Sequence, residues 1–267
     1  MSSGYVTSGG TNLYYETSGH GPAVLFIHAG VCDSRMWRDQ MDLEGIHAIV
    51  FDQRGFGNTE WVPGPYANRL DALTVLDHLG IEEAVVVGCS NGGEAALQTA
   101  LIAPERVAGL VIVGSAPRGW EPANGWGEEP FEDEIVAAQE AGDVEAVVRL
   151  EARLWLAGAG RDLEDLDPSV VELFLEMDRI PQTSEQERND NVQTLEPPTN
   201  EQLGRIRVPT SIIVGRHDLP ILHEAADYMA EQLSDRDAVV LEHTAHLPSM
   251  EVPDAFNEVL STFLGSI

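Results

Sequence analysis

Short apolar runs and stretches of helical period alternate along most of the chain. Continuously apolar runs are typical of strands buried on both faces, and they occur at Ala23–His28, His47–Phe51, Ala84–Val87, Val107–Val113, Val208–Val214 and Ala238–Leu241. Helical periodicity follows or separates them at Ala67–Leu79, Gly92–Ala103, Ala225–Leu233 and Ala255–Leu264. Before the first run, Tyr5–Ser8 and Asn12–Thr17 alternate around Gly9–Gly10, which predicts an antiparallel hairpin. The pattern predicts an α/β fold with a mostly parallel sheet covered by helices on both faces.

One region interrupts this alternation. Between residues 117 and 203 no strand-like run occurs, and the periodicity predicts helices at Glu132–Ala141, Val144–Leu156 and Pro168–Met177. We expect a helical cap at 117–203 inserted into a core made of residues 1–116 and 204–267. Leu154 and Trp155 of the cap, with Met36 of the core, are candidate pocket residues, although packing within each element explains them equally well.

Composition favours a soluble globular protein over a nucleic-acid-binding or membrane protein. The chain has 267 residues, of which 43% are hydrophobic, enough for one large domain with a buried core. Its formal net charge is −30, and all 15 basic residues are arginines. This excess of negative charge repels nucleic acids and anionic membranes, so we expect neither as a partner.

Cysteine content and hydropathy indicate a cytoplasmic location. The two cysteines, Cys32 and Cys89, make no disulfide framework, which fits a reducing compartment. The polar N-terminal segment lacks the features of a signal peptide, and no apolar stretch reaches the roughly 20 residues needed to span a bilayer.

The segment at residues 84–100 carries the clearest chemical signal. A buried strand leads into Gly88-Cys89-Ser90-Asn91-Gly92 and then into a helix, the setting that a G-x-S-x-G nucleophile turn requires. The tight turn leaves little room for a Cβ at the two glycines, and it presents Ser90 at a helix N-terminus that favours developing negative charge. The sequence therefore predicts Ser90 as a nucleophile, with Cys89 as a small buried spacer.

A serine nucleophile needs a base and a carboxylate that orients it. His246 follows the last strand and precedes the last helix, so it is expected at the same sheet edge as Ser90; His243 is the rival candidate. Asp218 follows the apolar run that ends at Val214, and carboxyl ends of parallel strands are where functional loops gather. The predicted catalytic residues are Ser90, Asp218 and His246.

Several segments resemble the α/β-hydrolase superfamily over nearly the whole chain. Besides the serine turn, Leu25–Gly30 resembles the family's H-G-x loop, Asp52–Gly57 its D-x-R-G-x-G turn, and Gly215–Phe263 its G-x-x-D and H-x-x-x-x-E-x-P-x-x-F endings. The resemblance implies a mostly parallel eight-stranded sheet flanked by helices, with an inserted helical cap. It also implies an oxyanion hole made by the backbone N–H groups of Gly30 and Asn91, with His28 holding the loop. Ala29 stands where glycine is commoner.

The resemblance favours small-molecule hydrolases of the enol-lactonase or carboxylesterase kind. We expect hydrolysis of a small carboxylic ester or lactone through an acyl-enzyme, with no metal and no cofactor, since no zinc-like or phosphate-binding spacing occurs. A carbon–carbon bond hydrolase, a proline-iminopeptidase-like enzyme and a slow-turnover ligand sensor remain alternatives on the same fold. The sequence leaves open whether the protein is a monomer or a homodimer.

Overall fold

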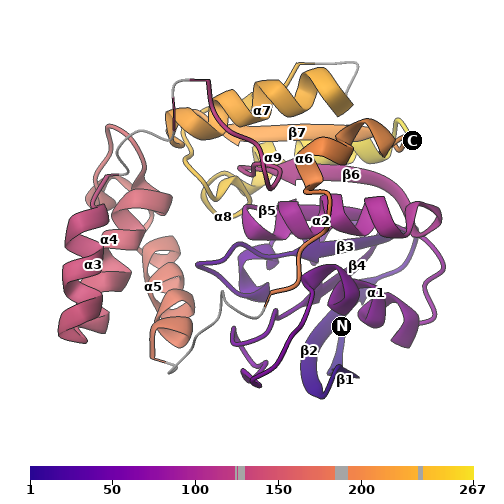
Figure 1. The fold of residues 1–267 in the computed structure, drawn as a ribbon, viewed down its shortest axis with the longest axis horizontal. Coiled ribbons are helices and arrows are strands. Elements are labelled where there is room, and N and C mark those ends of the chain that lie inside the picture. Colours follow the sequence, from indigo (N-terminus) through magenta and orange to yellow (C-terminus); the bar gives the residue numbers. More distant parts are fainter. Residues whose placement is uncertain (124, 126–129, 184–191, 234–236) are drawn as a thin grey trace.

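One mixed sheet forms the centre of the computed structural model, which describes residues 1–123, 125, 130–183, 192–233 and 237–267 (Figure 1). Across the sheet the strands run in the order β1-β2-β4-β3-β5-β6-β7-β8. The β1–β2 and β2–β4 pairs are antiparallel, and every pair from β4 onward is parallel. The strands are β1 (Ser2–Ser8), β2 (Thr11–Gly19), β3 (Ala23–Ile27), β4 (His47–Phe51), β5 (Ala84–Cys89), β6 (Val107–Val113), β7 (Thr210–Gly215) and β8 (Val239–Leu241).

Side chains of the central strands alternate between two apolar clusters, one on each face of the sheet. In β3, Leu25 and Ile27 join the cluster that contains residues of α1 (Asn68–His78), α2 (Asn91–Ile102) and α7 (Pro220–Leu233). Val24 and Phe26 join the opposite cluster, which contains Trp37 and residues of α9 (Pro253–Leu264). Because successive strand residues point to opposite faces, a strand covered on both sides must be apolar throughout. This explains why the runs read from the sequence coincide with the strands.

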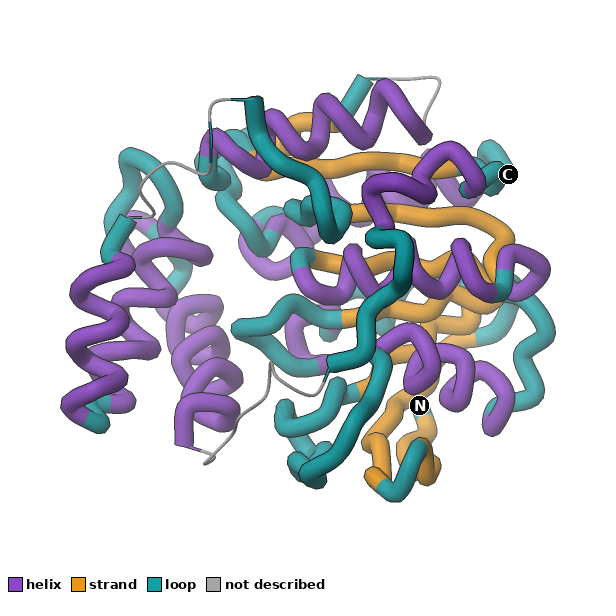
Figure 2. The backbone as a smooth tube through the Cα atoms, in the orientation of Figure 1, coloured by secondary structure: helices purple, strands orange, loops and turns teal. Residues whose placement is uncertain are grey.

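Helices cover both faces of the sheet, and Figure 2 separates them from the strands by colour. The predicted hairpin and strands are present, and the helices lie where the periodicity placed them, with shifted ends. The predicted helices are α1 (Asn68–His78), α2 (Asn91–Ile102), α7 (Pro220–Leu233) and α9 (Pro253–Leu264). The structure adds short elements that the sequence analysis did not predict: α6 (Thr199–Gln202), α8 (Pro248–Glu251), η1 (Ser34–Trp37), η2 (Pro104–Arg106) and η6 (Leu203–Arg205). This arrangement confirms the predicted fold class.

A separate group of helices lies beyond the end of the sheet to which the arrows of β5, β6 and β7 point (Figure 1). It contains α3 (Glu132–Ala141), α4 (Val144–Glu151), η3 (Ala152–Ala157, a π-helical segment), η4 (Leu163–Asp165) and α5 (Pro168–Thr183). Leu156 and Phe174 of this group belong to the apolar cluster that also holds Phe26. Residues 124, 126–129 and 184–191 of the expected cap lie outside the described residues.

Candidate active site

Ser90 occupies a strained turn between β5 and α2. Its backbone has φ 53° and ψ −118°, outside the regions that ordinary residues adopt, and its N–H donates to Val113 O at 2.8 Å. A Cβ at Gly88 would overlap the carbonyl of Gly92, and one at Gly92 would overlap the carbonyl of Ile27. The two glycines therefore let the strand and the helix approach closely, and such strain at a non-glycine residue is typical of functional sites.

Asp218 and His246 form a buried pair at the carboxyl edge of the sheet. Asp218 follows β7 and His246 follows β8, and His246 Nδ1 lies 2.9 Å from Asp218 Oδ2 and 3.1 Å from Oδ1. Asp218 is 5% exposed and His246 2%. An ionised carboxylate only accepts hydrogen bonds, so a neutral imidazole in this contact carries its proton on Nδ1 and keeps its lone pair on Nε2. This tautomer is the one that a general base requires.

Two contacts place the Asp218–His246 pair beside the Ser90 turn. The thiol of Cys89 donates to His246 O at 3.5 Å. Gly114, which follows the Val113 carbonyl bonded to Ser90, approaches the ring so closely that a Cβ there would lie 2.9 Å from His246 Nδ1. Burial raises the pKa of the Cys89 thiol well above its usual value, so this neighbour of Ser90 stays protonated and nucleophilically weak.

His243 lies elsewhere. Its backbone has φ 63°, and its carbonyl accepts a hydrogen bond from Arg161 Nη1 at 2.9 Å. Together with His217 it borders a crevice of about 320 Å³ between residues 161–170 and the core. The structure thus brings His246, rather than its rival, to Asp218.

Gly30 and Asn91 face one another across the Ser90 turn. A Cβ at Gly30 would lie 3.8 Å from Asn91 Cβ. Asn91 is the first residue of α2, so its N–H has no intrahelical acceptor. In the described part of the chain, no hydrogen bond of the Gly30 N–H is found. The two residues predicted to supply the oxyanion donors therefore lie next to one another.

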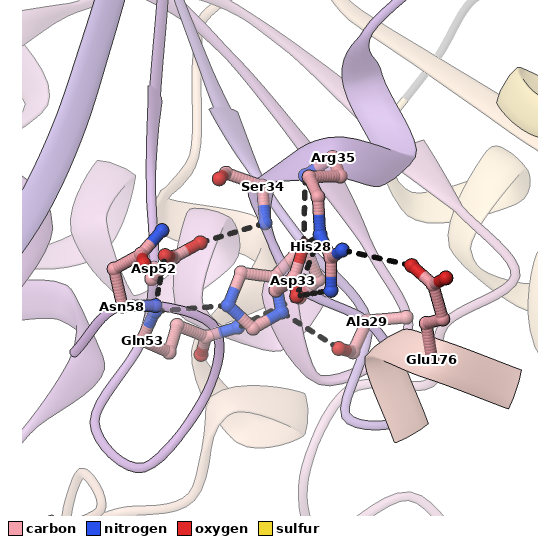
Figure 3. Close-up of polar contacts among 9 residues, drawn as sticks. All are labelled: His28, Ala29, Asp33, Ser34, Arg35, Asp52, Gln53, Asn58 and Glu176. Atoms are coloured by element: carbon pink, nitrogen blue, oxygen red, sulfur yellow. Dashed lines mark hydrogen bonds and ion pairs between the residues drawn. The ribbon is translucent and has the colours of Figure 1, made fainter. Parts of the chain in front are cut away.

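The loop after β3 is held by a buried polar network (Figure 3). His28 Nδ1 donates to Ala29 O at 2.8 Å, and His28 Nε2 accepts from the backbone N–H of Gln53 at 2.9 Å. Asp52 accepts from the backbone N–H groups of Ser34 at 2.8 Å and Asn58 at 2.7 Å. Burial lowers the pKa of His28 and raises that of Asp52. His28 thus acts as a neutral structural link, as its predicted role requires.

The predicted pocket residues have different surroundings. Met36 is fully buried, and its Sδ accepts from the backbone N–H of Ala29 at 3.3 Å, so it packs against the loop after β3. Leu154 is buried within η3. The indole of Trp155 lies against the imidazole of His246, with ring centroids 4.6 Å apart. Their contact with a substrate stays a prediction.

The sequence interpretation missed several residues around the site. Ser115 Oγ donates to Ser90 O at 2.8 Å, and Glu94 accepts from the Thr199 hydroxyl at 2.5 Å and from the Arg118 N–H at 3.1 Å. Burial raises the pKa of Glu94, an effect that these donors oppose. Gly114 and Ser115 directly follow an apolar run at the carboxyl end of a central strand, and this position was the available signal.

Two features are absent from the described residues. No group of three or more His, Cys, Asp or Glu side chains there is arranged to hold a metal ion. Within the same residues, no helix is both long enough and apolar enough to cross a membrane.

Comparison with known proteins gives consistent matches over most of the chain. The family model of the alpha/beta hydrolase fold matches residues 22–253. The RutD protein of Azorhizobium caulinodans is 31% identical, over 98% of both chains, and 3-oxoadipate enol-lactonase 2 of Acinetobacter baylyi is 27% identical, over 94% of this chain and 92% of its own. The solved structure of Est816, described as an N-acyl homoserine lactone degrading enzyme, matches with a TM-score of 0.77 and 25% identity, covering 97% of this chain and 100% of that one. The chain therefore belongs to the alpha/beta hydrolase fold family.

Proposed function

We propose that this enzyme is a serine hydrolase that cleaves a small carboxylic ester or lactone through an acyl-enzyme. The observation that carries the proposal is the buried His246–Asp218 hydrogen bond of 2.9 Å at the same sheet edge as the strained Ser90 turn. The relatives named as an enol-lactonase and a lactone-degrading enzyme support this substrate class. In the proposal residues 117–203 form a cap over this edge, and Leu154, Trp155 and Met36 border the substrate space.

Each residue has a defined part in the reaction. Ser90 Oγ attacks the substrate carbonyl while His246 Nε2 takes its proton, and Asp218 stabilises the imidazolium. The N–H groups of Gly30 and Asn91 bind the oxyanion. The imidazolium then gives its proton to the leaving alcohol, and a water molecule deprotonated by His246 attacks the acyl-enzyme and releases the acid and Ser90.

The direct test compares wild type with Ser90→Ala on p-nitrophenyl acetate and butyrate. We expect kcat/KM to fall by at least about 10⁴-fold, since removing the serine nucleophile of such a triad can cost up to about 10⁶-fold in kcat. Ser266→Ala is the matched control, because that hydroxyl is exposed at the end of the chain and donates only to Phe263 O. Equal activity of wild type and Ser90→Ala would refute the proposal.

A wider panel tests the alternatives. Lactones come first, and a carbamate ester is included because the name of RutD refers to carbamate hydrolysis. A diketone and an aminoacyl-naphthylamide test carbon–carbon and iminopeptidase activities. Tight ligand binding with turnover far below the typical 1–10³ per second would instead indicate a sensor.

A further inference from the structure

Residues 152–161, which follow α4, lie directly against the loop that carries His246. The backbone N–H of His246 donates to Trp155 O at 3.1 Å, and the two aromatic rings are in contact. Ala159 N–H donates to His217 O at 2.8 Å, and His217 Nδ1 donates back to Ala159 O at 2.8 Å. The imidazole is therefore supported by a segment outside the sheet as well as by Asp218.

Arg161 holds this segment to the histidine loop. Its Nε donates to Ala157 O at 2.7 Å and its Nη2 to Leu156 O at 3.0 Å, so it closes the end of η3. Its Nη1 donates to His243 O at 2.9 Å, three residues before His246. One guanidinium thus joins carbonyls of both segments.

Glu251 binds both Arg161 and the loop that carries His246, so Arg161 and Glu251 together form a clasp between the two segments. Its Oε2 lies 2.7 Å from Arg161 Nη2, and the two side chains are 3% and 13% exposed. Its Oε1 accepts from the Thr244 hydroxyl at 2.8 Å and from the Ala245 N–H at 2.9 Å, the residues directly before His246. Burial raises the pKa of Glu251, and the positive charge of Arg161 opposes that rise more than any other neighbouring group. Arg161 therefore helps to keep this buried carboxylate ionised.

We propose that Arg161 is a positioning residue for His246: it fixes the Trp155 segment and the histidine loop relative to one another, and so sets the orientation of the base. The inference rests on the proposed function. Only an arginine has enough donors in a planar fork to serve these four acceptors at once. Because a displacement of about 1 Å at a reacting group can cost about 10²-fold in rate, loss of the clasp should act on kcat.

The test uses Arg161→Gln and Arg161→Lys in the full chain, with p-nitrophenyl butyrate as substrate. We expect Arg161→Gln to lower kcat about 10- to 100-fold with KM changed less than about threefold, and Arg161→Lys to fall between it and wild type. Circular dichroism at the assay temperature shows that each variant is folded. Arg179→Gln is the matched control, because Arg179 pairs with Glu145 on the outer part of the same helical group. Its kcat should equal that of wild type.

A double-mutant cycle with Trp155→Leu separates positioning from general stability. If Arg161 acts through the Trp155–His246 contact, the double variant Arg161→Gln/Trp155→Leu loses clearly less than the product of the two single losses in kcat. Additive losses would overturn the inference, as would an unchanged kcat in folded Arg161→Gln. Should Arg161→Gln not fold, the same cycle with Arg161→Lys decides. Full activity of Ser90→Ala refutes the proposed function itself, whereas an inactive Ser90→Ala beside a fully active Arg161→Gln refutes only this inference.

Discussion

Gly114 lies where β6 ends and His246 meets Asp218. Its φ of +49° and its distance from the ring leave no room for a side chain: a Cβ would lie 2.9 Å from His246 Nδ1 and 3.1 Å from Asp218 Oδ2. Both distances fall below ordinary van der Waals contact, so the imidazole and the carboxylate would have to move. The absence of a side chain at Gly114 therefore leaves room for His246 and Asp218 to keep their hydrogen-bonded geometry.

Replacing Gly114 should accordingly affect catalysis more than folding. We expect Gly114→Ala to lower kcat about 10- to 100-fold through displacement of His246, while the left-handed backbone costs about 1–2 kcal/mol of unfolding free energy. Gly80→Ala is the control, since Gly80 has φ +68° and nothing within 4 Å of its Cβ position. Steady-state kinetics and urea unfolding measure the two effects; equal kcat in both variants would contradict the steric argument.

At the scale of elements, apolar runs predicted the strands well because both faces of this sheet are buried. The ends of the helices were predicted less accurately than the strands. The predicted helix Val144–Leu156 is α4 followed by a π-helical segment from Ala152, and there the Trp155 carbonyl accepts the His246 N–H. α7 begins at Pro220 rather than Ala225, although proline at a first helical position was a readable signal.

The candidate site likewise contains residues that local sequence predicts and residues that it does not. Ser90, Asp218 and His246 follow from a local motif and from chain order, since each lies directly after a strand. Arg161 and Glu251 are 90 residues apart and meet only in the folded chain. The H-x-x-x-x-E-x-P-x-x-F ending includes Glu251, but no local pattern marks its partner Arg161.

The loop after β3 and the turn at residues 52–58 depend on a neutral His28. Its lowered pKa means that below about pH 6.5 the unfolded chain binds a proton on this imidazole while the folded chain does not. Stability from this group is thus present above about pH 6.5 and is lost as the pH falls towards the lowered value.

We therefore expect His28→Asn to have a lower free energy of unfolding than wild type at pH 7.5. The difference in unfolding free energy between the two proteins should narrow as the pH falls to 6. The narrowing has an upper limit of about 1.4 kcal/mol per pH unit, measured by urea unfolding. The series stops at pH 6 because the raised pKa of Asp52 acts in the opposite sense in more acidic solution. A gap that stays constant or widens would show that His28 does not titrate in this way.

At the scale of the whole molecule, two arginine bridges tie the expected cap to loops of the proposed site. Arg161 pairs with Glu251 in the histidine loop, and Arg35, just after the loop that follows β3, pairs with Glu176 of α5 at 3.3 Å (Figure 3). The first bridge is buried and the second is exposed to solvent. Salt should therefore weaken the second more than the first.

Net charge should nevertheless dominate the response of the whole fold to salt. With a formal charge of −30, self-repulsion opposes the compact state. Raising NaCl from about 0.1 to about 1 M shortens the Debye length from roughly 10 to 3 Å, so we expect Tm to rise by several degrees. The rise should shrink near pH 5, where carboxylates begin to protonate. An unchanged or falling Tm at pH 7.5 would show that repulsion is not limiting.

The ring contact between Trp155 and His246 has a spectroscopic consequence. An excited indole can transfer an electron to a neighbouring imidazolium, which quenches its emission, whereas a neutral imidazole quenches far less. With ring centroids 4.6 Å apart, Trp155 emission should follow the charge on His246. Subtracting the spectrum of Trp155→Leu isolates this signal from that of the other four tryptophans. The unlabelled protein should thus carry an optical reporter of the charge on His246.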